Sequence, residues 1–371
     1  MNFQVLALVV MSVSMCLAAE VQLAGDFNAQ ARAILAERLL RPAQVAALGR
    51  VHRDLTHTLR QAWPGVRVLG IGSLATGLAL QSSDVDVVVK ANAGAVPAAA
   101  LVARALRLLA REAGTYRRVL AGNTHGGRRL PLIHLTHAPT HRECDISFSS
   151  QASVESTRLL SYYLSLDHRI KPLISLLKVW IEKQMADSPE HFQSKILYAL
   201  VIFYLEQKHI VPPPIVLQED LSDRFENKWN VRFNMVPFQS NNTESLYQLL
   251  GGFFKYYSSL NFADNFLAVH DGKVYPRSIF LNTSTIPDAF AVYKDYLSRP
   301  DSIPLDFDSD VCVQDFFLQN NNVADSMSSD LASDFFSHLK FAAKAFEELP
   351  SDRFLPAILT KIDLRNSTLS R

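Results

Sequence analysis

The sequence predicts an α+β fold with a mixed sheet, and three features lead to this expectation. Short strand-like segments separated by turns lie between residues 66 and 148. Helical patterns dominate from residue 154 onward. The later strands of the first region lack the crossover helices that a fully parallel sheet requires.

The length of 371 residues allows two domains, because a domain usually has on the order of 100 to 200 residues. The change from strand patterns to helix patterns places the boundary near residue 150. We expect a strand-rich domain over residues 45–150, a mainly helical domain over residues 151–349 and a C-terminal tail over residues 350–371.

The strand-rich part follows a helical pattern over residues 27–63, which the Pro64-Gly65 turn closes. A second helix is expected over residues 97–112, with its proline in the first turn. The expected strands cover residues 66–72, 85–90, 116–120, 130–135 and 142–148.

In the second part, residues 195–209 are apolar nearly all round, which indicates a buried helix. The pair Gly251-Gly252 lies inside another helical pattern, where each glycine costs about 1 kcal/mol relative to alanine. Close packing is the expected reason for this pair. The other expected helices cover residues 157–166, 168–185, 244–260 and 331–349.

The cysteines and the N-terminal segment give information on the cellular compartment of the protein. With only Cys16, Cys144 and Cys312, neither a disulfide framework nor a thiolate metal site is expected, which fits a reducing compartment. Residues 1–20 are apolar and of signal-peptide length. However, no Lys or Arg precedes Arg32, whereas a signal peptide has basic residues at its start and a mitochondrial presequence is rich in arginine. The segment is too short for a membrane span. The cysteine usage favours an intracellular protein, of the cytoplasm or the mitochondrion, and a signal or leader segment over residues 1–20 is the alternative.

Basic residues concentrate in one stretch, although the net charge of the chain is only +1. Residues 101–142 contain eight arginines against one acidic residue, Glu112. A solvated helix face is one interpretation, and a surface that binds a polyanion is the other. The same stretch contains histidines that alternate with apolar residues, and structural roles are expected for His134, His137 and His141.

Two aspartates interrupt an apolar run in the stretch GIGSLATGLALQSSDVDVVV, residues 70–89. Alternate residues of a strand point to the same face, so Asp84 and Asp86 project together while the valines face a core. Adjacent carboxylates repel each other unless a cation lies between them, and hard oxygen ligands of this kind suit Mg²⁺ or Mn²⁺. A solvent-exposed pair at a strand end is the alternative interpretation.

The surroundings of this pair favour the metal interpretation. Gly72 and Ser73 end the preceding strand, where small residues let a phosphate approach backbone N–H groups and a hydroxyl. A third acid, Asp145, lies between apolar neighbours in another short strand. Three carboxylates on neighbouring strands below a Gly-Ser turn are typical of a two-metal phosphoryl-transfer centre.

Several motifs in this order resemble the DNA polymerase β-type nucleotidyltransferases. The Gly-Ser pair, ten residues and DVDVVV, with the later CDISF, are similar to the signature of that family. The segments DHRIKPLISLLKVWIEKQ, ALVIFYLEQ, SLYQLLGGFFKYYSSLNF and VQDFFLQNNNVAD resemble the poly(A) polymerases and terminal uridylyltransferases with a PAP-associated domain. The resemblance covers roughly residues 45–345. It implies a catalytic domain and a helical domain, with a nucleoside triphosphate in the cleft between them.

The resemblance also implies roles for individual residues. Asp84 and Asp86 would hold both metal ions, Mg²⁺ or Mn²⁺. Asp145 would complete one metal site and help deprotonate the 3′-hydroxyl of an RNA, which attacks the α-phosphate and expels pyrophosphate. The residues that would contact the nucleotide are Gly72, Ser73, Ser156, Thr157, Lys178, Ser194, Lys195 and Asn321.

Three positions depart from the pattern of the family. Glu182 stands where a second basic residue is common, and Lys195 follows Ser194 where an aromatic residue is expected. Asn321 stands where the uridylyltransferases tend to have a histidine, so the resemblance favours ATP over UTP. A poly(A) polymerase in the style of the mitochondrial ones is the first expectation, and a terminal uridylyltransferase is the second.

An alternative from another class is a catalytically silent relative that binds RNA or acts as a scaffold. Glu182, Lys195 and the N-terminal segment motivate this alternative. The three acids argue against it, because carboxylates gathered without a metal ion destabilise a cleft.

Overall fold

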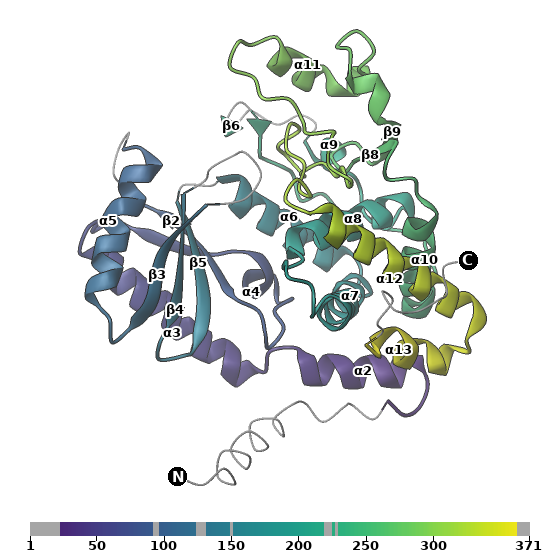
Figure 1. The fold of residues 1–371 in the computed structure, drawn as a ribbon, viewed down its shortest axis with the longest axis horizontal. Helices are drawn as coiled ribbons and strands as arrows, with labels where there is room; N and C mark the ends of the chain where they lie inside the picture. The colour runs from purple at the N-terminus through teal and green to yellow at the C-terminus, as the bar shows by residue number, and fades with distance from the viewer. Residues whose placement is uncertain are drawn as a thin grey trace.

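A five-stranded mixed sheet occupies the N-terminal half of the chain (Figure 1). The structure, a computed structural model, describes residues 23–91, 96–123, 131–148, 151–218, 225–226 and 229–361. The strands are β1 (Arg67–Gly70), β2 (Val85–Lys90), β3 (Tyr116–Asn123), β4 (Pro131–His137) and β5 (Arg142–Phe148), in the spatial order β1-β2-β5-β4-β3. Because β2 and β5 run parallel and the other neighbours run antiparallel, the expected mixed sheet of an α+β fold is confirmed.

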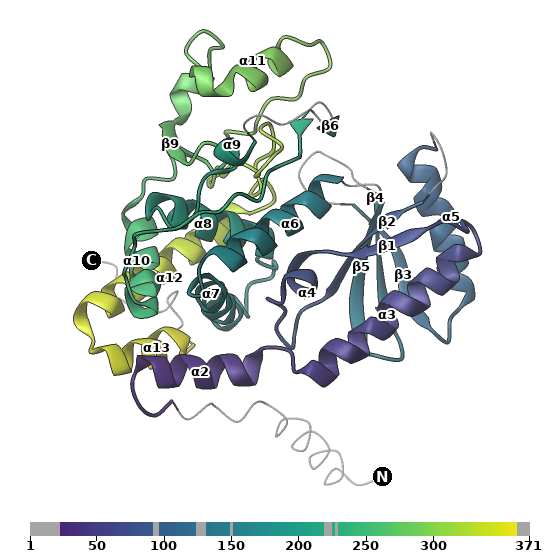
Figure 2. The same cartoon turned by 180° about the vertical axis from the view of Figure 1, so that it is seen from behind.

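Two helices, α3 (Pro42–Arg60) and α5 (Ala98–Arg111), border this sheet in both of the opposite views (Figures 1 and 2). They share a hydrophobic core with one face of the sheet, to which β2 contributes Val85 and Val87. Asp86 lies between these valines and therefore points to the opposite face. That opposite face carries the predicted acids.

The C-terminal half is mainly helical, with α6 (Gln151–Leu166), α7 (Ile170–Gln184), α8 (Ser194–Gln207), α10 (Leu246–Ser259) and α12 (Ser329–Glu348). Every residue of α8 from Ile196 to Glu206 is buried, which confirms the helix expected in the core. Trp180 of α7 packs edge-on against Phe254 of α10, with the ring centroids 4.8 Å apart. Contacts of this kind join the helices into one core.

The glycine pair of α10 lets neighbouring helices approach closely. A Cβ atom at Gly251 would lie 2.0 Å from the ring of Phe346 in α12, and one at Gly252 would lie 2.4 Å from the Tyr204 hydroxyl in α8. Both distances are far below van der Waals contact, so a larger residue requires the helices to shift. The close packing expected for this pair is confirmed.

The helical pattern over residues 27–63 is divided between two helices. Helix α2 (Phe27–Arg38) ends at Arg38, and α3 begins at Pro42. Arg41 is extended because the residue before a proline disfavours helical geometry, which explains the break. As a result, α2 packs into the core of the helical half, whereas α3 packs against the sheet.

A short helix, α13 (Ser351–Leu359), occupies part of the segment that we expected to be a C-terminal tail. It buries Phe354 and Ile358 in the core to which α2 also belongs. The side-chain amide of Gln30 in α2 donates a 2.7 Å hydrogen bond to the carbonyl of Asp352. This part of the expected tail is therefore a packed helix.

The remaining elements are short. They are α4 (Gly72–Thr76), α9 (Pro214–Leu217), α11 (Ala291–Leu297), the strand pair β6 (Phe225–Glu226) and β7 (Trp229–Asn230), the strand pair β8 (Asn265–Ala268) and β9 (Lys273–Pro276), and the 3-10 turns Arg277–Phe280 and Asp288–Phe290. Phe266 and Phe290 belong to a separate hydrophobic cluster in this region. Within the described ranges, no helix combines the length and the apolar character needed to cross a membrane.

Candidate active site

The three predicted acids lie side by side on the face of the sheet opposite α3 and α5. Asp86 belongs to β2, and Asp84 precedes this strand by one residue. In the parallel pairing of β2 with β5, Asp86 stands directly opposite Asp145. Val85 and Cys144, the residues just before these two, are buried in the core on the other face. The register of β2 and β5 thus brings the acids together.

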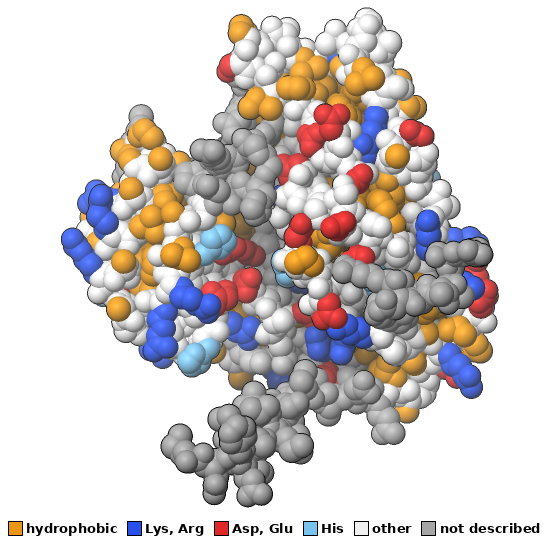
Figure 3. Space-filling model, viewed as in Figure 1, with side chains coloured by type: hydrophobic (Ala, Val, Ile, Leu, Met, Phe, Trp, Pro, Cys, Tyr) orange, Lys and Arg blue, Asp and Glu red, His pale blue; other side chains and the backbone are white. Residues whose placement is uncertain are grey.

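A hollow separates the sheet from the helical half in the space-filling view (Figure 3). Acidic side chains and a histidine side chain gather on the sheet side of this hollow. Asp145 keeps 33% of its side chain exposed. Asp145 and the exposed Asp84 are therefore accessible to a ligand, whereas Asp86 is half-buried.

Burial and mutual repulsion raise the pKa values of two of these acids. The pKa of Asp86 rises to about 7, first because the carboxyl is buried and then because the negative charges of Asp145 and Asp84 lie close to it. Burial and the charge of Asp145 also raise the pKa of Asp84. A divalent cation would relieve this repulsion, so the three carboxylates fit Mg²⁺ or Mn²⁺ as a set of hard oxygen ligands.

The acids do not enclose a single point. In the part of the chain that the structure describes, no three side chains of His, Cys, Asp or Glu are arranged around one metal position. Asp145 instead directs Oδ1 toward the neighbouring strand, where His134 Nδ1 lies 2.5 Å away. The carboxylates are thus neighbours that would have to turn toward a bound cation.

Gly72 places the predicted phosphate turn beside the acids. It follows β1 and begins α4 with a φ angle of +63°, which glycine adopts without strain. A Cβ atom at this position would lie 3.0 Å from Asp86 Oδ2, so the backbone passes directly beside the acid. The Gly72 N–H donates to Thr157 Oγ1 over 3.1 Å. Ser73 is buried next to Gly72, and Ser156 is partly buried next to Thr157 on α6.

Lys178 of α7 approaches the same region from the helical half. Its side chain is buried, and Nζ donates a 3.0 Å hydrogen bond to the Leu78 carbonyl and lies 5.9 Å from the centre of the Tyr198 ring. Burial lowers the pKa of Lys178 to about 8, while the negative charges of Glu182 and Asp86 act in the opposite direction. The ammonium group therefore lies near the acids, where a triphosphate-binding cation is expected.

Glu182, which stands where the family commonly has a basic residue, is engaged by two neighbours. Its carboxylate accepts hydrogen bonds from the Arg38 guanidinium of α2 and from the Ser82 hydroxyl in the loop before β2. These bonds connect α2, α7 and the sheet. Glu182 is thus neutralised by an arginine from another helix, and it is not an isolated negative charge beside the cleft.

The residues expected to contact the base of the nucleotide lie apart from the three acids in the hydrogen-bond pattern of the described residues. Lys195 is exposed at the start of α8, and Ser194 lies one helical turn before Tyr198. The side-chain amide of Asn321 donates to the Asp315 carboxylate over 3.4 Å. Among the described residues, no hydrogen bond or ion pair joins Lys195 or Asn321 to the three acids. Their role in base recognition stays a prediction.

The structure adds a contact to the structural role expected for His134. This residue lies within β4, directly opposite Asp145 of β5, and contacts its carboxylate. His137 is fully buried and bonded to Asp54 and Thr140, which agrees with the structural role expected for it. The alternation of His134 with apolar neighbours could have placed it on the face of the acids, once the register of β4 and β5 is known.

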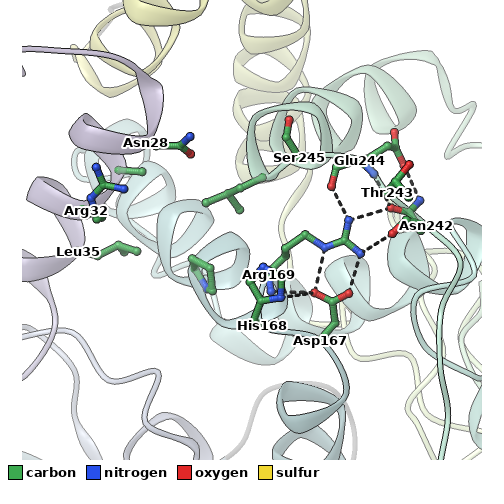
Figure 4. A pocket seen from close by; sticks show the side chains of 13 residues that line it. Asn28, Arg32, Leu35, Asp167, His168, Arg169, Asn242, Thr243, Glu244 and Ser245 are labelled. Carbon is green, nitrogen blue, oxygen red and sulfur yellow. Dashed lines mark hydrogen bonds and ion pairs between the residues drawn. The ribbon is translucent and has the colours of Figure 1, made fainter.

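A cavity of about 650 Å³ lies elsewhere, between α2, the turn before α7 and the start of α10 (Figure 4). Arg169 donates to the Asp167 carboxylate over 2.6 Å and to the Asn242 carbonyl over 3.0 Å, and so joins two of the walls. None of the residues predicted to bind metal or nucleotide lines this cavity. The acids of the sheet remain the candidate site.

Comparison with known proteins identifies the sheet-bearing region. Residues 27–165, which contain all three acids, match the family described as "Poly(A) RNA polymerase, mitochondrial-like, central palm domain". The chain is similar in sequence to poly(A) polymerases and terminal uridylyltransferases. The match begins with α2 and ends in α6, so it includes the helices that precede the strands in the sequence and the helix that follows them.

Two curated relatives illustrate the range of this family. The terminal uridylyltransferase cid1 of Schizosaccharomyces pombe is 30% identical over 216 residues, which are 54% of this chain and 51% of that protein. The speckle targeted PIP5K1A-regulated poly(A) polymerase of Danio rerio is 28% identical over 224 residues, or 56% of this chain and 27% of the relative. The matched region thus spans about half or less of these relatives.

Two solved structures share the fold of this chain. The Cid1 poly(U) polymerase bound to MgGTP superimposes with a TM-score of 0.70 and 21% identity, over 90% of this chain and 98% of that one. The structure of mtPAP in complex with ATPγS gives a TM-score of 0.74 and 18% identity, over 91% of this chain and 73% of that one. The likeness therefore extends beyond the palm to the helical half.

Proposed function

We propose that this chain is a template-independent RNA 3′-end nucleotidyltransferase. One observation carries the proposal: Asp84, Asp86 and Asp145 lie together beside the Gly72 turn, on the palm of a chain whose homologues are poly(A) polymerases and uridylyltransferases. The three acids are the expected ligands of Mg²⁺ or Mn²⁺. Ions bound there would stabilise the charge that develops on the triphosphate.

The chain's own side chains divide the remaining tasks. Ser73 and the Gly72 turn bind phosphate oxygens, and Lys178 supplies a positive charge to the triphosphate. Asp145 accepts the proton of the RNA 3′-hydroxyl. As the 3′-oxygen forms its bond to the α-phosphorus, the bond from that phosphorus to pyrophosphate breaks. In this proposal Thr157, whose hydroxyl accepts a hydrogen bond from the Gly72 N–H, contacts the ribose.

ATP is the nucleotide that we expect this enzyme to use. Asn321 stands where uridylyltransferases tend to have a histidine, and the matching palm family is of the mitochondrial poly(A) polymerase type. UTP is the second candidate, because one relative at 30% identity is a terminal uridylyltransferase. A location in the cytoplasm or the mitochondrion stays a prediction from the cysteine usage.

The nucleotide preference is tested by incubating the purified chain with a 5′-labelled RNA, Mg²⁺ or Mn²⁺, and one nucleoside triphosphate at a time. We expect extension with ATP to be at least about tenfold faster than with UTP, a difference of about 1.4 kcal/mol in barrier. Asn321→His should increase the relative use of UTP, whereas Asn321→Ala, the matched control, should not. Extension with UTP alone would assign the chain to the uridylyltransferases, and no extension with any nucleotide would favour the silent relative.

A further inference from the structure

A row of residues crosses the palm sheet at one level. Asp86 of β2, Asp145 of β5, His134 of β4 and Leu120 of β3 are successive cross-strand neighbours. The first two are expected metal ligands, and His134 stands immediately beside them with 47% of its side chain exposed. The proposed reaction gives this imidazole no task, although it contacts Asp145 from the side away from Asp86.

A short hydrogen bond fixes the imidazole to the acid. Nδ1 of His134 lies 2.5 Å from Oδ1 of Asp145. An ionised carboxylate can only accept hydrogen bonds, so Nδ1 carries the hydrogen and donates it. A carboxylate held through one oxygen presents its other oxygen in a defined direction, as carboxylates do when an outer partner orients them at a metal site.

Gly122 of β3 provides the space in which the imidazole ring lies. A Cβ atom at Gly122 would lie 2.3 Å from Cδ2 and 2.4 Å from Nε2 of His134. Contacts this short do not occur, so any side chain at this position would displace the ring. The φ angle of Gly122 is not in the left-handed region, so the ring requires the missing side chain and not a special backbone angle.

We infer that His134 is a positioning residue for Asp145, and that Gly122 is the residue that admits its ring. By donating from Nδ1 to Oδ1, the imidazole occupies one oxygen of the Asp145 carboxylate and leaves Oδ2 as the oxygen that ligates a divalent cation together with Asp86. The inference rests on the proposed function for the identity of that cation, Mg²⁺ or Mn²⁺. The hydrogen bond and the position of the ring are features of the chain itself.

Binding of Mn²⁺ to the whole chain, measured by calorimetry without RNA or nucleotide, tests this inference. His134→Ala should weaken Mn²⁺ binding about tenfold, as the loss of an outer partner does at other metal sites. His134→Asn should stay within about threefold of the wild type, because its amide N–H can donate to the same oxygen. Gly122→Ala should weaken binding in the same way as His134→Ala, although His134 is still present.

A double variant and two controls separate positioning from a general loss of structure. Gly122→Ala added to His134→Ala should cause no further loss, because the ring that it displaces is already absent. Gly114→Ala is the control for the glycine, since nothing lies within 4 Å of the added Cβ atom. His57→Ala, on the exposed side of α3, is the control for the histidine. Both controls should bind Mn²⁺ like the wild type.

Unchanged Mn²⁺ affinity in both His134→Ala and Gly122→Ala would overturn the inference. Tighter binding in His134→Ala would overturn it as well, because the imidazole would then compete with the ion. A nitrogen hyperfine coupling between bound Mn²⁺ and the His134 ring would show a ligand and not a positioning residue. RNA extension by the wild type is measured separately and tests the proposed function alone. If no extension is found, the Mn²⁺ affinities of the variants still decide the inference. If extension is found, unchanged Mn²⁺ affinities still overturn the inference.

Discussion

Asp86 is a carboxylate that the metal-free fold holds at a cost in stability. Its pKa in the folded chain is about 7, against an ordinary value of 3.8, because burial and the charges of Asp145 and Asp84 disfavour ionisation. The folded state therefore binds this proton more tightly than the unfolded state does. The destabilisation develops as the pH rises above the ordinary pKa and is complete once the pH has passed about 7.

Asp86→Asn should therefore stabilise the metal-free chain. Its gain in free energy of unfolding over the wild type should grow by about 2 kcal/mol between about pH 5 and about pH 8, since only the wild-type residue ionises in that interval. Denaturant unfolding in the presence of EDTA at both pH values measures the gain. An exposed acid replaced in the same way, Asp308→Asn, is the control. A gain that does not change with pH would contradict the account.

Among single residues, the acids could be predicted from the sequence, whereas the contact of His134 with one of them could not. Asp84 and Asp86 could be found because two acids at the strand period inside an apolar run are unusual. His134 could not be assigned in the same way, because its partner depends on the register of β4 against β5. A one-residue change of register would have placed the imidazole away from Asp145.

At the scale of whole elements, helix α10 contains a glycine pair that is unfavourable for a helix but allows close contact with neighbouring helices. Gly251 and Gly252 lower the helix propensity of the segment, yet the helix forms because its neighbours pack against these two positions. A glycine whose added Cβ atom would meet no neighbour closely has no such reason. Gly49 of α3 is an example, because its added Cβ atom would only reach ordinary contact distance from Arg53, at 3.5 Å.

Gly251→Ala should lower the free energy of unfolding by about 1–3 kcal/mol, because the new methyl group overlaps the Phe346 ring. Gly49→Ala, the matched control in α3, should raise it by about 0.5–1 kcal/mol through helix propensity alone. Thermal or denaturant unfolding of both variants makes the comparison. Equal effects in the two helices would show that the contact with Phe346 is not tight.

Most elements could be predicted from the sequence, and the exceptions have physical reasons. The strand expected at residues 85–90 is β2 with the same bounds, because Val and the alternation of acids specify it. The break between α2 and α3 was missed, because the periodicity continues through Leu39 and Leu40 into Pro42. A proline can occupy the first turn of a helix or end the previous one, and the pattern does not distinguish these cases.

For the whole molecule, four arginines of the arginine-rich stretch are exposed near one edge of the sheet. Arg107 and Arg111 are exposed on α5, and Arg117 and Arg118 are exposed on β3, the strand at that edge. Arg118 is paired with Glu143 over 2.7 Å. Exposed arginines are compatible with both the polyanion-binding and the solvated-surface interpretations of the stretch, which differ in the salt dependence that they predict.

Arg117→Ala combined with Arg118→Ala should weaken RNA binding at low salt. If each arginine contacts one phosphate of a single strand, the slope of log affinity against log salt should fall by about 1.4. Filter binding or fluorescence anisotropy over a range of salt concentrations measures the slope. Arg353→Ala, on α13, should leave it unchanged. Unchanged affinity of the double variant at low salt would favour the solvated-surface interpretation.

The contact between helices α2 and α13 could not be predicted from the sequence. Helices α2 and α13 share a core, and Gln30 bonds to Asp352 across 322 positions. Local patterns identify a helix from its spacing of apolar residues, but they do not specify which distant helix covers it. The family resemblance supplied the order of domains, and the packing of α2 against α13 came only from the structure.

The central claim is that the acids of the palm catalyse transfer of a nucleotide to an RNA 3′ end. Extension of a labelled RNA with ATP and Mn²⁺ by the wild type and by Asp86→Asn, compared under identical conditions, tests it most directly. We predict lengthened RNA with the wild type and a loss of more than about a hundredfold in Asp86→Asn, because a direct ligand matters more than an outer partner. Extension by Asp86→Asn at nearly the wild-type rate would contradict the claim.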